Sequence, residues 1–169
     1  MSQRSSSRHG GRVEMTKQHE YAVQILWRDL SGAGTRSYSS YSRDHVISVE
    51  GKPEIAASSD PTFRGDAHRY NPEELLLASL ASCHMLWYLH LCAVNGINVL
   101  DYHDEAHGVM EEAGDGGGAF IGVTLRPRVR IGAGGDRALA LALHEQAHGL
   151  CFIARSVNFP VHCEAQVAS

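Results

Sequence analysis

The chain has 169 residues, of which 43% are apolar and 20% are charged, and its formal net charge is −4. This apolar content is sufficient for one hydrophobic core of ordinary size. The negative net charge and the presence of only two lysines, Lys17 and Lys52, leave no basic field, so we expect no nucleic-acid partner.

The first residues differ in composition from the rest of the chain. Residues 1–18 are rich in serine, arginine and glycine and contain no apolar run. We expect a disordered tail there, neither signal peptide nor membrane anchor, and a single domain over residues 19–169. The expected location is the cytoplasm.

The pattern of apolar residues predicts strands before residue 50. Strands are expected over residues 21–28 and 35–49, with a first turn at 31–34 and a second near 43–44. Residues 51–69 contain two prolines and are expected to form a loop.

A long helix is predicted after this loop. Asn71 is a favoured N-cap, a proline follows at the first helical position, and Glu74 stands where its carboxylate can reach back to the Asn71 N–H. Residues 75–94 contain no Lys, Arg, Asp or Glu, and an Asn-Gly pair then provides a stop signal. The expected helix has about 24 residues and a length of ~36 Å.

A helix of this length and apolarity must be weighed as a transmembrane span. The histidines His84 and His90 and the lack of a basic cluster at either end favour a core helix instead, so we expect no membrane insertion. Because the helix is apolar nearly all round, it requires cover on most sides. One chain of this size would struggle to provide that cover, so we expect a partner subunit.

The second half of the chain alternates between strands and a helix. Long strands are predicted over residues 98–112 and 120–131, joined by a glycine-rich hairpin turn at 114–118. A helix with an aspartate at its N-cap follows over 136–150, and a short strand over 159–167. This order predicts an α+β fold with a mostly antiparallel sheet.

The four cysteines form no CxxC pair, and in a reducing compartment structural disulfides are not expected. A redox or catalytic pair remains open. Cys83 and Cys92 are nine residues apart on the predicted helix, so they face opposite sides and cannot bridge. Any intrachain partner of Cys83 must come from later in the chain.

Three short motifs stand in order along the chain. Arg36 follows Gly34-Thr35, residues 71–75 read Asn-Pro-Glu-Glu-Leu ahead of Ala-Ser-Cys83, and residues 147–151 read Ala-His-Gly-Leu-Cys. From about residue 21 to the C-terminus the chain resembles the OsmC/Ohr family of thiol-dependent peroxidases. The resemblance implies mostly antiparallel sheets packed around a long central helix, in an intertwined homodimer.

The resemblance also implies roles for four residues. Cys83 is the peroxidatic thiol, Cys151 the resolving thiol, Arg36 the activator of the thiol, and Glu73 the residue that holds Arg36. The implied substrate is an organic hydroperoxide and the implied reductant is a lipoyl-type dithiol. Neither a cofactor nor a metal is expected. A guanidinium favours a thiolate, and a sulfenic acid condenses with a second thiol to a disulfide.

Helix geometry adds a constraint, because ten residues along one helix separate Glu73 from Cys83 by ~15 Å. If both belong to one site, the expected arrangement draws them from different subunits. The chain also departs from the family at two neighbours of the cysteines, since the family often has Phe where His84 stands and Pro where Phe152 stands.

Two other functions remain open. Residues 144–148 read His-Glu-Gln-Ala-His, the pattern in which two histidines of a zinc protease bind the metal. Only 21 residues follow, with no downstream helix to supply a third ligand, so this is a remote alternative. The other is a small-molecule protein that holds a fatty ligand with little or no turnover. Cys92 and Cys163 match no motif and are expected to be structural.

Overall fold

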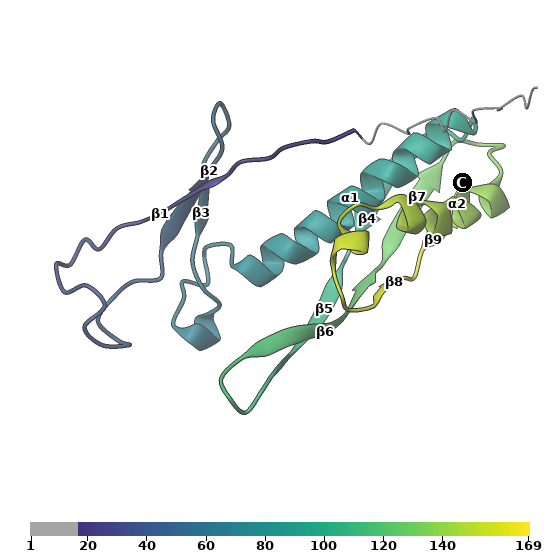
Figure 1. Ribbon diagram of the computed structural model, residues 1–169. Helices are drawn as coiled ribbons and strands as arrows, with labels where there is room; N and C mark the ends of the chain where they lie inside the picture. Colours follow the sequence, from purple (N-terminus) through teal and green to yellow (C-terminus); the bar gives the residue numbers. More distant parts are fainter. Residues whose placement is uncertain (1–16) are drawn as a thin grey trace, which may run out of the picture.

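The computed structural model describes residues 17–169, so most of the predicted tail lies outside the described residues. A small sheet lies at one end, the long helix α1 runs away from it, and a larger layer of strands with helix α2 lies along the other part of α1 (Figure 1). The elements in chain order are β1 Gln24–Trp27, β2 His45–Ser48, β3 Ile55–Ala57, η1 Pro61–Phe63, α1 Pro72–Val94, β4 Val99–Asp104, β5 His107–Glu112, β6 Gly118–Leu125, β7 Pro127–Ile131, α2 Arg137–Leu150, η2 Ala154–Ser156, β8 Val161–Cys163 and β9 Gln166–Ala168.

The first sheet is antiparallel, in the order β1-β2-β3. It lies beyond the N-terminal end of α1, and in Figure 1 it is apart from strands β4–β9. All four residues of β1 are exposed, and three of them are the apolar Ile25, Leu26 and Trp27. This sheet therefore has an apolar surface that the described part of the chain leaves uncovered.

The predicted strand over 35–49 is wrong for residues 35–44, of which 35–41 form turns and bends and 42–44 have no regular structure. The Arg43 guanidinium donates hydrogen bonds to the carbonyls of Tyr38 and Tyr41 and lies 4.5 and 4.0 Å from the centres of their rings. Polar backbone groups are thus satisfied locally and not by a strand ladder. The predicted loop over 51–69 is also wrong in part, because it contains β3 and η1.

Helix α1 confirms the predicted boundaries and cap. Asn71 Oδ1 accepts from the Glu74 N–H at 2.8 Å, and Glu74 Oε2 accepts from the Asn71 N–H at 3.1 Å. The chain leaves the helix through Gly96, whose φ of 74° suits glycine. Every fourth residue forms a buried stripe, which consists of Leu80, His84, Tyr88 and Cys92.

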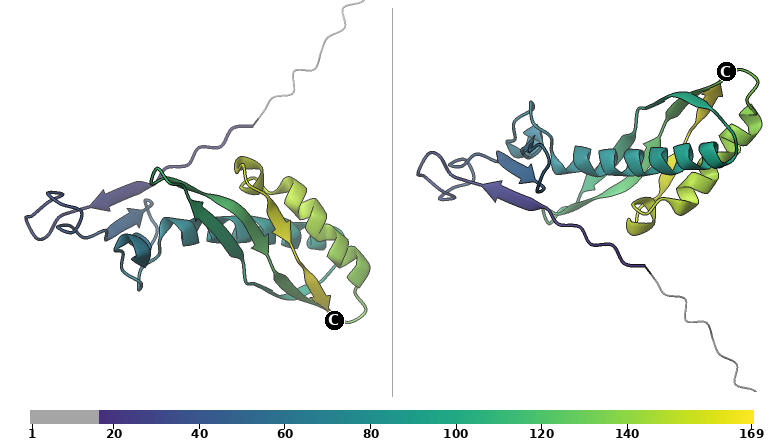
Figure 2. Two further views of the ribbon diagram at one scale, coloured as in Figure 1. Left: turned by 90° about the horizontal axis from the view of Figure 1, so that it is seen from below. Right: turned by 90° about the horizontal axis from the view of Figure 1, so that it is seen from above.

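The stripe packs against α2 and β4 of the same chain, as a core helix does. Helix α1 is long and apolar enough to cross a bilayer. Only 22% of its most apolar 18-residue window is buried by the described chain. One long side of α1 is free of other elements along much of its length (Figure 2). The described chain therefore provides only part of the cover that the apolar helix requires.

The predicted hairpin is confirmed, but each of its two long strands is divided. The first long strand is divided into β4 and β5, and the second into β6 and β7 at Arg126. Strand β4 pairs with β7, and β5 pairs with β6. The Arg126 N–H donates to Asp104 Oδ1 at 2.7 Å, and the next residue, Pro127, has no N–H to donate. A side-chain hydrogen bond thus replaces a ladder bond at the bend.

The predicted final strand is divided as well, and β8 and β9 pair parallel to β6 and β7. The sheet orders are β5-β6-β8 and β4-β7-β9, so both sheets are mixed and not wholly antiparallel. Helix α2 begins at the predicted Asp136, whose carboxylate accepts from the Leu139 N–H. The α+β class is confirmed.

Two groups of buried side chains hold these layers together. One lies between the second half of α1, α2 and β7, and the other between the first half of α1 and β6. Each fully buried leucine among them contributes about 1.5–3 kcal/mol. Their members are Tyr88, Cys92, Ile97, Val129, Ile131, Ala140, Leu143 and Ala147 in the first, and Leu80, Val123 and Leu125 in the second.

Candidate functional site

The structure brings together two of the cysteines singled out by the sequence. Cys83 lies on α1 and is half-buried, whereas Cys151 lies at the C-terminal cap of α2 and is buried. The Cys83 side chain lies near enough to Cys151 to contribute to the raised pKa of that thiol. They are held there by the packing of α1 against α2. The pairing expected from the motifs is thus present as a spatial relationship.

Burial raises the pKa of Cys151 to about 11. The Ala154 N–H, 3.4 Å from Cys151 Sγ, opposes that rise, and the neighbouring Cys83 adds to it. A thiol with so high a pKa is protonated at neutral pH, and the thiolate is the stronger nucleophile. In the reduced protein Cys151 therefore keeps its proton and is a weak nucleophile.

An open apolar pocket of about 520 Å³ adjoins Cys83. Trp87 and Phe152 form one side of it, in an edge-to-face pair with ring centres 5.7 Å apart. The atypical Phe152 is thus part of the pocket wall. The lining consists of Ser79, Ser82, Cys83, Leu86, Trp87, His90, Phe152 and Ile153. Such a lining suits an apolar or aromatic molecule that approaches the thiol.

The other two predicted site residues do not join the thiols within one chain. Arg36 is exposed in the segment between β1 and β2, which lies at the far end of the molecule from α2 (Figure 1). Among the described residues, no hydrogen bond or ion pair links Arg36 to Glu73 or Cys83. Glu73 Oε2 is buried and has no hydrogen-bond partner in the described chain. A buried carboxylate oxygen of this kind requires a partner.

A second cluster, which the sequence motifs did not reveal, lies in the core beside the thiols. His84 Nε2 of α1 is 3.1 Å from His144 Nδ1 of α2 and 3.7 Å from Cys163 Sγ of β8. Their potential ligand atoms all lie within 4.8 Å of one another. Among the described residues, this group does not include His148, the second histidine of the His-x-x-x-His pattern.

Burial controls the charge of the two histidines. It lowers the pKa of His84 to about 4, with a smaller effect from His148. It lowers the pKa of His144 to about 3, with a smaller effect from His84. Both rings are therefore neutral at pH 7 in the metal-free protein. Burial also raises the pKa of Cys163 to about 11.

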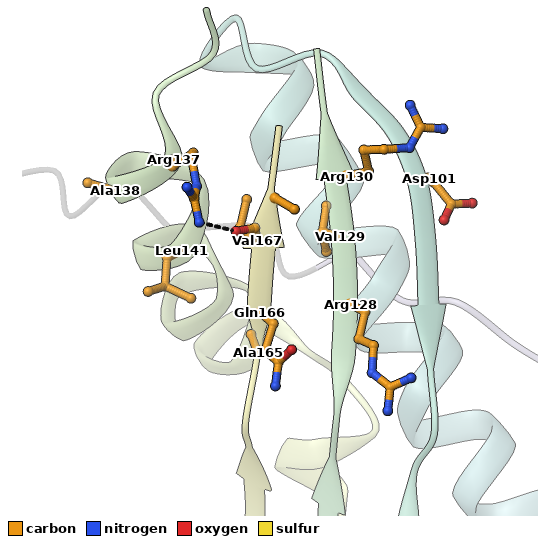
Figure 3. A pocket seen from close by; sticks show the side chains of 11 residues that line it. Asp101, Arg128, Val129, Arg130, Arg137, Ala138, Leu141, Ala165, Gln166 and Val167 are labelled. Atoms are coloured by element: carbon orange, nitrogen blue, oxygen red, sulfur yellow. Dashed lines mark hydrogen bonds between the residues drawn. The ribbon is translucent and has the colours of Figure 1, made fainter. Parts of the chain in front are cut away.

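The largest hollow described, about 820 Å³, lies elsewhere, against β7, β9 and the start of α2 (Figure 3). Arg128 and Arg130 of β7 contribute to it, and Arg137 of α2 donates to the Val167 carbonyl at 2.8 Å. Its lining contains no cysteine and no histidine. The smaller pocket, in contrast, is lined by Cys83, the cysteine that follows the Asn-Pro-Glu-Glu-Leu motif.

Comparison with known proteins agrees with the motifs. The OsmC-like protein family matches residues 65–166, which include both paired cysteines. An OsmC-like protein of unknown function from Vibrio cholerae is 29% identical, with a TM-score of 0.80 over 88% of this chain and 100% of that one. No curated protein sequence matches the chain.

Two solved structures of organic hydroperoxide resistance proteins share the fold. One, from Legionella pneumophila, is 19% identical, with a TM-score of 0.63 over 90% of this chain and 100% of that one. The other, OhrB of Bacillus subtilis, is 21% identical, with a TM-score of 0.58 over 88% and 98%. The family match over residues 65–166, which is more than half of the sequence, establishes that this α+β chain belongs to the OsmC-like protein family.

Proposed function

We propose that the protein is a cysteine-based peroxidase that reduces organic hydroperoxides in defence against oxidative stress. The observation that carries the proposal is the proximity of Cys83 to Cys151, whose pKa it helps to raise, beside an apolar pocket. A half-buried thiol that a substrate can reach, next to a buried second thiol, matches the requirements of a two-cysteine cycle. Two proteins with the same fold are organic hydroperoxide resistance proteins.

The first step uses Cys83. Its thiolate attacks the distal oxygen of ROOH, the O–O bond breaks, and the alkoxide takes a proton to leave as ROH. The sulfur is oxidised to a sulfenic acid as the peroxide is reduced. The apolar wall formed by Leu86, Trp87 and Phe152 receives the organic group. Apolar side chains around the Cys83 sulfur lower the local dielectric and so strengthen electrostatic interactions with the thiolate.

The second step uses Cys151. Its thiol loses a proton, the sulfur attacks the Cys83 sulfenic acid, and water leaves as the disulfide forms. An external dithiol of the lipoyl type then exchanges with the disulfide and restores both thiols, while it becomes oxidised itself. The cycle requires neither a metal nor an organic cofactor. Such a reductant is consistent with a cytoplasmic location, where thiols are kept reduced.

Arg36 and Glu73 complete the proposed site in a homodimer. In one chain Glu73 has a buried, unpaired carboxylate oxygen, and ~15 Å of helix separates it from Cys83. The exposed apolar faces of α1 and β1 provide surface for a second subunit. In the proposed dimer, Arg36 pairs with Glu73 and its guanidinium stabilises the Cys83 thiolate and the departing alkoxide.

A ligand-binding role without turnover is the second candidate. The apolar pocket favours it, because an aromatic-lined cavity of about 520 Å³ also fits a fatty or aromatic ligand. The high pKa of Cys151 favours it too, since a protonated thiol resolves a sulfenic acid slowly.

One assay separates the two candidates. Cumene hydroperoxide is supplied with dihydrolipoamide, and its consumption is followed for wild type, Cys83→Ser, Cys151→Ser and the control Cys92→Ser. We expect Cys83→Ser to lose activity, Cys151→Ser to lose turnover but retain one equivalent of peroxide reduction, and Cys92→Ser to resemble wild type. If Cys83→Ser turned over as fast as wild type, the mechanism would be wrong. A wild-type protein that binds the product, cumyl alcohol, but does not consume cumene hydroperoxide would favour the ligand-binding role.

A further inference from the structure

Two buried histidines and one half-buried cysteine, from three separate elements, converge beside the proposed peroxidase site. His84 comes from α1, His144 from α2 and Cys163 from β8, and the peroxidase cycle uses none of them. We propose that His84 Nε2, His144 Nδ1 and Cys163 Sγ form a site for a borderline-soft transition metal, Zn²⁺ in the first place. The site does not depend on the peroxidase activity, so either proposal can fail without the other.

The distances between the potential ligand atoms suit zinc. For tetrahedral Zn²⁺ with Zn–N near 2.05 Å and Zn–S near 2.3 Å, the expected N···N separation is about 3.3 Å and the expected N···S separation about 3.6 Å. The separation of His84 Nε2 from His144 Nδ1 is 3.1 Å, and that from Cys163 Sγ is 3.7 Å. All three atoms lie within 4.8 Å of one another, so one ion can reach them together.

Nitrogen and sulfur ligands also select among metals. Two imidazoles and a thiolate favour Zn²⁺ and related transition ions, whereas Mg²⁺ and Ca²⁺ prefer oxygen. Cys163 provides the thiolate: its S–H proton passes to solvent as the S–Zn bond forms. The two rings are buried between α1 and α2, so packing restricts the motion of both side chains.

In the metal-free protein the two rings are joined by a hydrogen bond. Their planes differ by 8° and their centres are 5.4 Å apart, and His84 Nε2 faces His144 Nδ1 at 3.1 Å. Metal binding moves the shared proton to the far nitrogen of its own ring. Each ring then turns so that its lone pair points toward an ion on the Cys163 side.

The hydrogen bond alone is a poor reason for two buried histidines. His84 Nδ1 and His144 Nε2 are buried with no partner in the described chain, so one hydrogen bond serves four ring nitrogens. Buried polar atoms without partners are destabilising, and an apolar pair would avoid that. A metal would replace the single hydrogen bond with two metal–nitrogen bonds at the facing nitrogens, His84 Nε2 and His144 Nδ1.

An access route reaches the cluster from solvent. A hollow of about 500 Å³ is lined by His144, His148 and Cys163 together with the carboxylates of Glu145 and Glu164. These carboxylates favour the approach of a cation. Since the chain supplies three ligands, a water molecule from this hollow is the expected fourth, as at zinc sites with an exchangeable position.

The test is a metal titration of the full-length, reduced, metal-stripped protein. Zn²⁺ is titrated in competition with a chromophoric chelator, and Co²⁺ is titrated while the near-ultraviolet spectrum is recorded. We expect one equivalent of either ion and a thiolate-to-cobalt charge-transfer band. Since loss of an outer-shell partner already costs about 10–100-fold in metal affinity, Cys163→Ser and His144→Gln are each expected to weaken Zn²⁺ binding at least about tenfold. Cys163→Ser should also remove the band.

Matched variants exclude the neighbouring alternatives. His148→Gln is expected to retain wild-type affinity, whereas a metal bound by the His144–His148 pair would be lost. Cys83→Ser is likewise expected to retain the band, whereas an ion held by the Cys83–Cys151 thiols would lose it. The proposal is overturned by the absence of a stoichiometric cobalt–thiolate band in wild type, which requires no variant to fold. A band that persists in Cys163→Ser would also overturn it.

Discussion

His84 Nε2 lies 3.1 Å from His144 Nδ1 in the interior, within a stripe that otherwise consists of Leu80, Tyr88 and Cys92. The Tyr88 ring stacks on the His144 ring with their centres 3.8 Å apart. This relationship joins the middle of α1 to α2, one residue from the Cys83 thiol. The pair places two groups that can bind protons in the core, so the stability of the core is expected to depend on pH.

Acid is expected to destabilise the metal-free protein through this pair. As the pH falls, unfolded histidines bind protons near pH 6.5, whereas folded His84 does so near pH 4 and His144 near pH 3. The unfolded state therefore binds more protons between these values, and the free energy of unfolding falls with pH in that window. The groups that face the pair are His148, Cys163, Tyr88 and Tyr102. Urea unfolding from pH 7 to pH 4, in the presence of a chelator, measures this effect.

A double variant provides the control for the acid effect. His84→Leu/His144→Leu removes both titrations and is expected to lose less stability than wild type between pH 6.5 and 4. His162→Gln, which changes an exposed histidine, should follow wild type. An equally steep loss in the double variant would show that other groups cause the acid sensitivity.

Local signals explain why both helices could be predicted from the sequence. Asn71 and Asp136 provide caps that act within one turn, and both make the expected hydrogen bonds. The bend between β6 and β7 depends instead on the contact of Arg126 with Asp104, 22 residues away, which no short pattern reveals. The segment 35–44 resembled a strand, but Arg43 satisfies its carbonyls in turns.

The candidate site follows the same division. Cys83 and Cys151 each lie in a motif, so the sequence could suggest the pair, and in the structure Cys83 lies near enough to contribute to the raised pKa of Cys151. His144 and Cys163 follow His84 by 60 and 79 residues, respectively, and the three residues share no motif. The local His-x-x-x-His spacing pointed to His148 as the partner of His144, whereas tertiary packing selected His84.

The core between the helices predicts a contrast between two leucines of α2. Leu143 is 1% exposed and Leu141 is 48% exposed. Leu143→Ala is expected to lower the free energy of unfolding by about 2–5 kcal/mol, since it leaves a cavity. Leu141→Ala deletes the same atoms from the surface and should lower it by less than about 1 kcal/mol. Urea unfolding at pH 7 compares them; equal losses would contradict the packing described.

Formation of the disulfide is expected to accelerate with pH. Burial, the largest cause of the high pKa of Cys151, persists after Cys83 is oxidised. Below a pKa of about 11, the thiolate fraction of Cys151 rises about tenfold per pH unit, and the thiolate is the attacking species. Stopped-flow fluorescence of Trp87, after one equivalent of cumene hydroperoxide at pH 7 to 9, follows the step. Cys151→Ser should lack this phase, and a rate independent of pH would place another group in the attack.

The surface of β1 leads to a prediction about subunit assembly. Ile25 is 61% exposed in one chain, although it is a large apolar residue of a paired strand. If a second subunit covers this sheet, Ile25→Glu places a charge in an apolar interface and should shift the dimer toward monomer. The neighbouring Gln24→Glu adds the same charge on the other face of β1 and should leave the dimer intact. Sedimentation equilibrium of the two variants and wild type measures the effect. A wild type that sediments as a monomer at all concentrations would contradict the dimer and leave Glu73 without the Arg36 partner that the peroxidase mechanism assigns to it.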